Sequence, residues 1–293
     1  MAFALYIDGH LRRSEPSEPR LPWWSFTKTV LAAAALSLVD DRRMGLDELV
    51  PEGPFTLRQL LGHEAGLADY DELTDYHAAV ARGDDAWPAE EMLQRVDATR
   101  LRYPPGEGWR YSNVGYLYIC RLIERASGLP LAHALDQRVF KPLGLTDVAL
   151  VRERTDLPGM TGYDTAWVYH GLLVGPIGQA ALLLDRLLSG HLLSEGMLAQ
   201  MRCARVLGGP IAGTPWQVPG YGLGLMQGEV AGGLLLAGHT GSGPGSSVAV
   251  YGATDGIRRA TCAVFRRGGQ AAATEAETVG HLSESLGLPP RSH

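Results

Sequence analysis

The stretch SFTKTVLAAAALSLVDDRR, residues 25–43, is rich in alanine and leucine and apolar on almost every side. Alanine and leucine are strong helix formers, and basic residues just before Gly45 are typical of a helix C-terminus. A helix that is hydrophobic all round must be buried on all sides. The sequence therefore predicts a fold large enough to enclose one long helix. Its 293 residues, 45% of them hydrophobic, suffice for such a core.

The elements on either side of this helix differ in kind. Before it, FALYIDGHLRR predicts two short strands with a tight turn at Asp8-Gly9. After it, helical periodicity fills the middle of the chain, beginning with FTLRQLLGHEAGL, where Thr56 is in N-cap position. From about Tyr221, short apolar runs divided by glycines predict an antiparallel meander, and TEAETVGHLSESLG predicts a closing helix.

This order of elements favours an α+β fold rather than alternating βαβ units. The simplest assembly joins the N-terminal hairpin to the C-terminal meander in one antiparallel sheet flanked by helices. Residues 1–55 and 215–293 would then form a discontinuous sheet domain, and residues 56–214 an inserted all-α lobe.

Charge and cysteine content narrow the function. The net charge is −6 with both signs interspersed, so we expect neither a nucleic-acid nor a membrane partner, but a small molecule. No apolar run reaches the roughly 18 residues of a membrane span. The N-terminus has no signal-peptide pattern, so we expect a cytoplasmic protein. Three widely spaced cysteines, Cys120, Cys203 and Cys262, predict neither disulfides nor a metal site.

Ser25 and Lys28 allow two interpretations. Ser25 can be an N-cap and Lys28 an ordinary helix lysine, which is the commoner meaning of such spacing. Alternatively, Lys28 lies one turn along on the same face and reaches the Ser25 hydroxyl, while the helix N-terminus favours a developing alkoxide. Burial of an ammonium lowers its pKa until the amine can act as a base. The pair would then be a nucleophile with its activator.

Two further motifs are equally ambiguous alone. In GEGWRYSNVGY, Tyr111 can be a loop residue and Asn113 an N-cap, or a phenol whose pKa an ammonium lowers beside an amide that holds Lys28 or a substrate. In AGHTGSGPGSS, the segment His239-Thr240-Gly241 can be a glycine-rich hairpin. It can also be a strand end that a substrate approaches closely, with the Ser242 amide facing an oxyanion.

In this N-to-C order, Ser-x-x-Lys, Tyr-x-Asn and His-Thr-Gly resemble the serine β-lactamase and penicillin-binding protein superfamily. The likeness is to its class C-like branch of esterases, D-stereospecific amidases and DD-carboxypeptidases. LRQLLGHEAGL, YPPGEGWRYSNVGYLY and GHTGSGPGSS are similar to that branch as well. The resemblance implies a β-lactamase/transpeptidase-like fold with the active site between the sheet and the helical lobe.

The resemblance also implies roles for the residues. Ser25 attacks an acyl carbonyl, Lys28 takes its proton, Tyr111 relays protons, and Asn113 positions Lys28 and the acyl chain. The remaining residues would bind substrate: the amide of Ser242 completes an oxyanion hole with that of Ser25, and His239, Thr240 and Gly241 line the opposite wall. No metal and no organic cofactor is implied.

The expected function is hydrolysis of small-molecule esters or amides, with esters slightly ahead. The alternatives are a DD-peptidase or β-lactamase type of penicillin-interacting enzyme and a binding protein that retains the pocket without turnover. Because His239 replaces the lysine of true β-lactamases, β-lactam hydrolysis should be weak. Trp23 and Trp24 should pack in the core; if one faces the cleft, it favours an apolar or aromatic acyl group. The acidic DYDELTD segment is taken as a solvated loop.

Overall fold

The computed structural model describes residues 1–15, 20–154, 157, 160 and 162–288. Within them, the central element is an antiparallel sheet with the strand order β2-β1-β11-β10-β9-β8-β7-β6. Its strands are β1 (Ala2–Ile7), β2 (His10–Ser14), β6 (Arg205–Val206), β7 (Trp216–Tyr221), β8 (Met226–Val230), β9 (Leu234–Gly243), β10 (Ser246–Thr254) and β11 (Arg259–Arg267). Because β1 pairs with β11, both ends of the chain meet in one sheet, as the sequence predicted.

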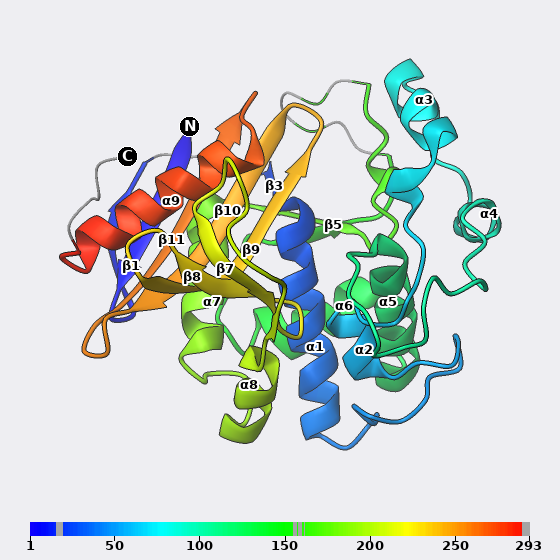
Figure 1. The fold of residues 1–293 in the computed structure, drawn as a ribbon, viewed down its shortest axis with the longest axis horizontal. Coiled ribbons are helices and arrows are strands. Elements are labelled where there is room, and N and C mark those ends of the chain that lie inside the picture. The colour runs from blue at the N-terminus through cyan, green and yellow to red at the C-terminus, as the bar shows by residue number, and fades with distance from the viewer. Residues whose placement is uncertain (16–19, 155–156, 158–159, 161, 289–293) are drawn as a thin grey trace.

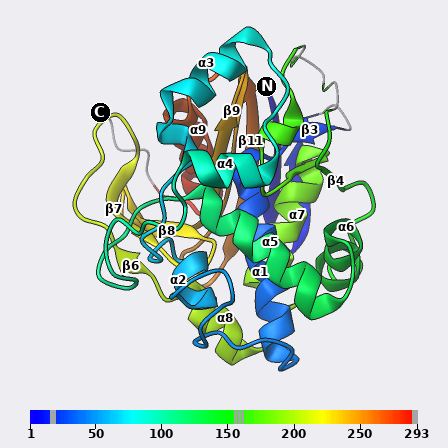
Figure 2. The same cartoon turned by 90° about the vertical axis from the view of Figure 1, so that its right-hand side faces the viewer.

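The N-terminal hairpin turns where the sequence predicted. Asp8 and Gly9 have φ angles of 51° and 79°, the left-handed conformation that a tight hairpin turn requires. In the central strands, successive side chains point to opposite faces of the sheet, and a helix covers each face. Val248 and Val250 belong to the core on the side of α7 (Ile177–Leu188), whereas Ala249 and Tyr251 pack on the side of α9 (Ala271–Ser285). Figure 2 shows these two helices on opposite sides of the sheet.

Helix α1 (Thr27–Asp40) is the predicted interior helix. Every residue from Thr27 to Leu38 is buried. The helix lies between the sheet on one side and three helices of the middle segment on the other (Figure 1). These are α2 (Leu57–Leu61), α5 (Asn113–Ser127) and α6 (Leu131–Leu135). Thr56 caps α2 through a reciprocal capping box with Gln59, as its position indicated.

The middle segment contains strands that the sequence patterns did not predict. Besides α3 (Thr74–Arg82), α4 (Ala89–Arg95) and α8 (Glu195–Arg202), it contributes β4 (Ala149–Val151) and β5 (Leu172–Gly175). Together with β3 (Leu21–Pro22), these form a small sheet in the order β3-β5-β4. Strands of two to four residues are too short to show a period of two. The domain limits near residues 55 and 215 remain a prediction. No helix in the described ranges has the length and apolarity needed to cross a bilayer.

Candidate active site

Ser25 lies in a single 3₁₀ turn, Trp24–Phe26, that leads into α1. Strand β5 holds this turn at both ends: the Trp23 amide donates to the Leu173 carbonyl at 2.8 Å, and the Leu173 amide donates to the Thr27 hydroxyl at 3.1 Å. Phe26 occupies the N-cap of α1 and no side chain caps the helix. The Ser25 hydroxyl is therefore not used as a cap.

Lys28 meets Ser25 inside the protein. Its Nζ lies 3.1 Å from the Ser25 Oγ, and the residue has no exposed surface. The same nitrogen lies 5.0 Å from the ring centre of Tyr111. Burial lowers the pKa of Lys28 to about 7, and the carboxylate of Asp69 partly opposes this by raising it. An amine with such a pKa is suited to accept a proton near neutral pH.

Tyr111 hydrogen-bonds to Ser25, but its phenol behaves differently from the prediction. Burial raises the pKa of Tyr111 well above its ordinary value of 10.0, and the bond to Ser25 only partly offsets this. The expectation that an ammonium would lower this pKa is therefore wrong. The cause is that desolvation of the phenolate outweighs the hydrogen bond with Ser25, while the nearby Asp69 and Asp71 raise the pKa further. The phenol of Tyr111 is therefore protonated near neutral pH.

His63 hydrogen-bonds to both sequence neighbours of Tyr111 and packs against the Tyr111 ring. The Arg110 amide donates to the His63 carbonyl at 3.0 Å, and the Ser112 amide donates to His63 Nδ1 at 3.1 Å. The rings of His63 and Tyr111 are 4.2 Å apart between centroids. His63 itself has a φ of 60°, a conformation that is uncommon for a residue with a side chain.

Asn113 bonds to a carboxylate that the sequence did not single out. Its Nδ2 donates to Asp69 Oδ2 at 3.0 Å, and its backbone amide donates to the same oxygen at 3.2 Å. Burial raises the pKa of Asp69 to about 6. The N-cap of α5 is Ser112 rather than Asn113. The prediction that the acidic segment is a solvated loop is wrong for Asp69, since only 6% of that residue is exposed.

His239 belongs to a chain of hydrogen bonds behind the site. Because the Ser112 amide occupies Nδ1 of His63, the His63 proton lies on Nε2 and is donated to the Tyr221 hydroxyl at 3.1 Å. Tyr221 in turn donates to His239 Nε2 at 3.0 Å, and His239 Nδ1 donates to the Thr240 carbonyl at 2.6 Å. Burial and the nearby Lys28 lower the pKa of His239 to about 3, so the imidazole is neutral.

The residues that follow His239 on β9 have different surroundings. The Thr240 hydroxyl donates to Glu275 of α9 at 2.6 Å, so its side chain lies behind the sheet and not in the cleft. Gly241 lies against the turn Trp24–Phe26 that carries Ser25, where a Cβ would come within 2.5 Å of the Ser25 nitrogen. Ser242 lines the cleft. Strand β9 thus places the backbone of residues 241 and 242 beside Ser25.

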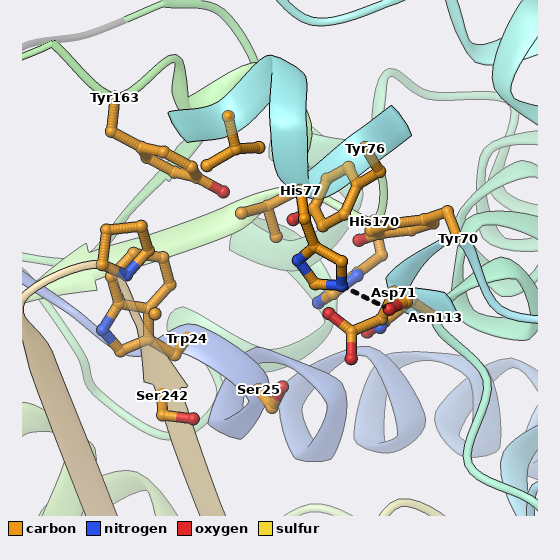
Figure 3. Close-up of a pocket in the computed structure, with 14 residues that line it drawn as sticks. Trp24, Ser25, Tyr70, Asp71, Tyr76, His77, Asn113, Tyr163, His170 and Ser242 are labelled. Atoms are coloured by element: carbon orange, nitrogen blue, oxygen red, sulfur yellow. Dashed lines mark hydrogen bonds between the residues drawn. The ribbon is translucent and has the colours of Figure 1, made fainter. Parts of the chain in front are cut away.

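The cleft above Ser25 has a volume of about 400 Å³. Four aromatic side chains line it: Trp24, Tyr70, Tyr76 and Tyr163. Figure 3 shows Ser25 between Trp24 on one side and Asp71 on the other. Trp23, by contrast, is fully buried, with its indole Nε1 donating to the Gly175 carbonyl at 3.3 Å. One of the two tryptophans therefore faces the cleft.

His170 is a site residue that the sequence did not indicate. It lines the cleft, is 2% exposed, and its Nε2 lies 3.2 Å from Lys28 Nζ. It lies within the apolar segment WVYHGLLVG, 142 residues from Lys28 along the chain. No local pattern distinguishes it from a histidine packed in the core.

Comparison with known proteins agrees with this geometry. A family model described as Beta-lactamase matches residues 1–276. The chain belongs to the beta-lactamase family. The resemblance inferred from the three motifs is thereby confirmed.

Two curated relatives of this beta-lactamase family chain illustrate its similarities. A D-aminopeptidase of Cereibacter sphaeroides is 28% identical over 258 residues, which cover 81% of this chain and 48% of that protein. Penicillin-binding protein 4* of Bacillus subtilis is 30% identical over 131 residues, covering 42% of this chain and 28% of that protein. The chain spans about half the length of the D-aminopeptidases it matches.

Solved structures establish the fold. A D-stereospecific amidohydrolase from Streptomyces sp. superposes with a TM-score of 0.80 at 23% identity, covering 98% of this chain and 94% of that one. A D-amino acid amidase from Ochrobactrum anthropi SV3 gives a TM-score of 0.77 at 22% identity, covering 97% and 95%. The β-lactamase/transpeptidase-like α+β fold predicted from the sequence is therefore confirmed.

Proposed function

We propose that this chain is a serine hydrolase that cleaves small amides of amino acids through an acyl-enzyme on Ser25. The observation that carries this is the fully buried Lys28 amine, 3.1 Å from the Ser25 hydroxyl. Lys28 takes the hydroxyl proton as Ser25 Oγ attacks the carbonyl carbon. Tyr111, hydrogen-bonded to Ser25 and protonated, donates a proton to the leaving amine. Water then cleaves the ester with the same groups acting in reverse.

The negative charge that develops on the carbonyl oxygen needs fixed donors. The backbone amides of Ser25 and Ser242 are suited to this role. At Gly241, the backbone of β9 lies directly against the turn that carries Ser25. Preorganised backbone amides in a water-poor site stabilise such an oxyanion strongly. The start of α1 adds the positive end of a helix dipole.

The lining of the cleft supports an aromatic amino acid amide with a free ammonium group as the substrate. The four aromatic rings suit an aromatic side chain. Asp71 lines the same cleft and, within the described part of the chain, its carboxylate has no lysine or arginine partner, so it can pair with a substrate ammonium. The sequence placed esters slightly ahead of amides; relatives named D-aminopeptidase and D-amino acid amidase favour amides, and the D configuration.

A substrate panel tests this proposal. It contains D- and L-phenylalanine amide, N-acetyl-D-phenylalanine amide, p-nitrophenyl acetate and nitrocefin, assayed with the wild type and Ser25→Ala. We expect D-phenylalanine amide to be hydrolysed fastest, a loss of at least about 100-fold in Ser25→Ala, and an acyl adduct in the intact mass of the wild type. Asp71→Asn should raise KM for the free amine but not for the N-acetyl amide.

Each other outcome identifies a different alternative. Rapid nitrocefin turnover would favour a β-lactamase-type enzyme. A folded protein that binds these compounds without turnover or adduct would be a binding protein, and the catalytic proposal would be abandoned.

A further inference from the structure

His170 touches the amine that we assign as the general base. Its Nε2 lies 3.2 Å from Lys28 Nζ, and the Ser25 Oγ lies 3.1 Å from the same nitrogen. Its Nδ1 is buried and has no hydrogen-bond partner among the described residues. In the cleft of Figure 3, His170 lies beneath Tyr76, behind the ring of His77. No other described side chain has a hydrogen bond to Lys28 besides Ser25 and His170.

The proton inventory of the two groups decides the direction of their bond. An ammonium has three donors and no acceptor, so a protonated Lys28 can bond to His170 only if Nε2 is unprotonated. A neutral Lys28 has one lone pair. If His170 donated to that lone pair, the amine would have nothing left to accept the Ser25 proton. Only the form of His170 with its proton on Nδ1 suits both states of Lys28.

We propose that His170 is a positioning residue that accepts an Nζ–H bond from Lys28 at Nε2 and so directs the amine lone pair at the Ser25 hydroxyl. The inference rests on the proposed function, since it assigns Lys28 as the base. This tautomer leaves the Nδ1–H group of His170 buried without a hydrogen-bond acceptor among the described residues. Native proteins usually avoid such a group outside functional sites.

The backbone around His170 fixes its position. The Cys120 thiol bonds to the His170 carbonyl at 3.2 Å. The chain then enters β5 within three residues, where Leu173 holds the nucleophile turn at both ends. The same short segment, residues 170–173, therefore contacts both the Ser25 turn and Lys28.

Other titratable groups act on Lys28 from the elements packed around it. They are Asp69 before α3, Cys120 and Tyr116 of α5, Tyr111, His63, and His239 of β9. Asp69 and Cys120 raise the pKa of Lys28. His63, His170 and His239 are all held neutral by burial and by Lys28 itself. Among them, His170 alone contacts the Lys28 amine directly, so its removal should be visible in the titration of Lys28.

The test compares His170→Phe, which keeps a ring without an acceptor, with His170→Gln, whose amide oxygen can replace Nε2. His281→Phe is the matched control, because His281 is a partly buried imidazole that stacks on Phe3 at 4.6 Å on the α9 side of the sheet. The rate of Ser25 modification by a fluorophosphonate is measured from pH 5 to 10. Long-range ¹H–¹⁵N spectra of histidine-labelled wild type report which nitrogen of His170 carries the proton.

We expect His170→Phe to lower the plateau rate by about 10- to 100-fold, as for a misdirected catalytic group. The acidic limb of the pH–rate profile should move to lower pH in this variant. The reason is that the ammonium form of Lys28 loses a hydrogen-bond acceptor that stabilised it, so the pKa of Lys28 falls. His170→Gln should restore both features, and His281→Phe should match the wild type. The wild-type spectrum should place the His170 proton on Nδ1.

Two results would overturn the inference. One is a His170→Phe variant whose plateau rate and acidic limb are the same as in the wild type. The other is a spectrum that places the His170 proton of the wild type on Nε2. The spectrum decides the matter even if His170→Phe does not fold. Failure of the proposed function looks different. In that case the fluorophosphonate does not modify Ser25 in the folded wild type at any pH, whatever the tautomer of His170.

Discussion

Lys28→Met should stabilise the protein at neutral pH while abolishing catalysis. In the unfolded chain a lysine holds its proton up to about pH 10.5, whereas in the folded protein burial lowers the pKa to about 7. Between these values unfolding takes up a proton, so the stability of the wild type rises with pH. Below pH 7 both states are protonated and the full penalty acts. Methionine has a similar length and no charge, and so removes this penalty.

The magnitude follows from the displacement of the pKa. Each tenfold change in proton affinity is worth about 1.4 kcal/mol, so at pH 7 the move from 10.5 to about 7 destabilises the fold by about 4 kcal/mol. At pH 9 the same penalty is about 2 kcal/mol. Methionine loses the bonds to Ser25 and His170, worth about 1 kcal/mol each. The net gain should be about 2 kcal/mol at pH 7 and close to zero at pH 9.

Urea unfolding at pH 7 and pH 9 measures both quantities, with Lys141→Met as the control at an exposed lysine paired with Asp136. The chain has only these two lysines, so ¹³Cε-lysine labelling gives two side-chain resonances. The one lost in Lys28→Met should titrate near pH 7. The argument that burial makes this amine available as a base would be refuted by either of two results. One is an increase in the free energy of unfolding of Lys28→Met that is equal at both pH values. The other is a Lys28 resonance that titrates above pH 9.

Three further substitutions test the surroundings of the site. Gly241→Ala should reduce acylation by about 100-fold or more, because its Cβ would lie 2.5 Å from the Ser25 nitrogen; kinetics with D-phenylalanine amide check this. Gly280→Ala, in α9 with open space around it, should raise the free energy of unfolding by about 0.5–1 kcal/mol without changing activity. Thr240→Val should lower stability by about 1–3 kcal/mol, since it removes the donor to buried Glu275, and should change KM little; a rise in KM above about tenfold would place Thr240 in the cleft after all.

Elements with a local signal could be predicted from the sequence. The all-apolar composition of α1 required an interior position, Asp8-Gly9 required a hairpin turn, and Thr56 required a helix start. The three motifs placed Ser25 and Lys28 together because three residues are nearly one helical turn. Each of these inferences depends on residues that are close in sequence.

What could not be predicted depends on contacts between distant segments. Asp69 occupies an acidic stretch whose composition is that of a solvated loop, and only the packing of Asn113 against it shows that it is buried. His170 reaches Lys28 through β5, a four-residue strand without a readable period. The direction of the Tyr111 pKa shift depended on the balance between desolvation and the hydrogen bond with Ser25, which only the folded geometry sets.

Arginine and lysine occupy different kinds of position in this chain. Of 26 lysines and arginines, 24 are arginines, and many form ion pairs with acidic residues near the surface, as Arg58 does with Asp47 and Arg266 with Glu277. A guanidinium cannot lose its proton in a protein, which suits a permanent charge but not a base. A lysine ammonium can lose its proton once water is removed from it. The chain therefore has a lysine at the position in the core where the proposed reaction needs a proton acceptor. The free energy by which burial of Lys28 destabilises the fold is the same free energy that lowers its pKa and leaves the amine partly unprotonated at neutral pH.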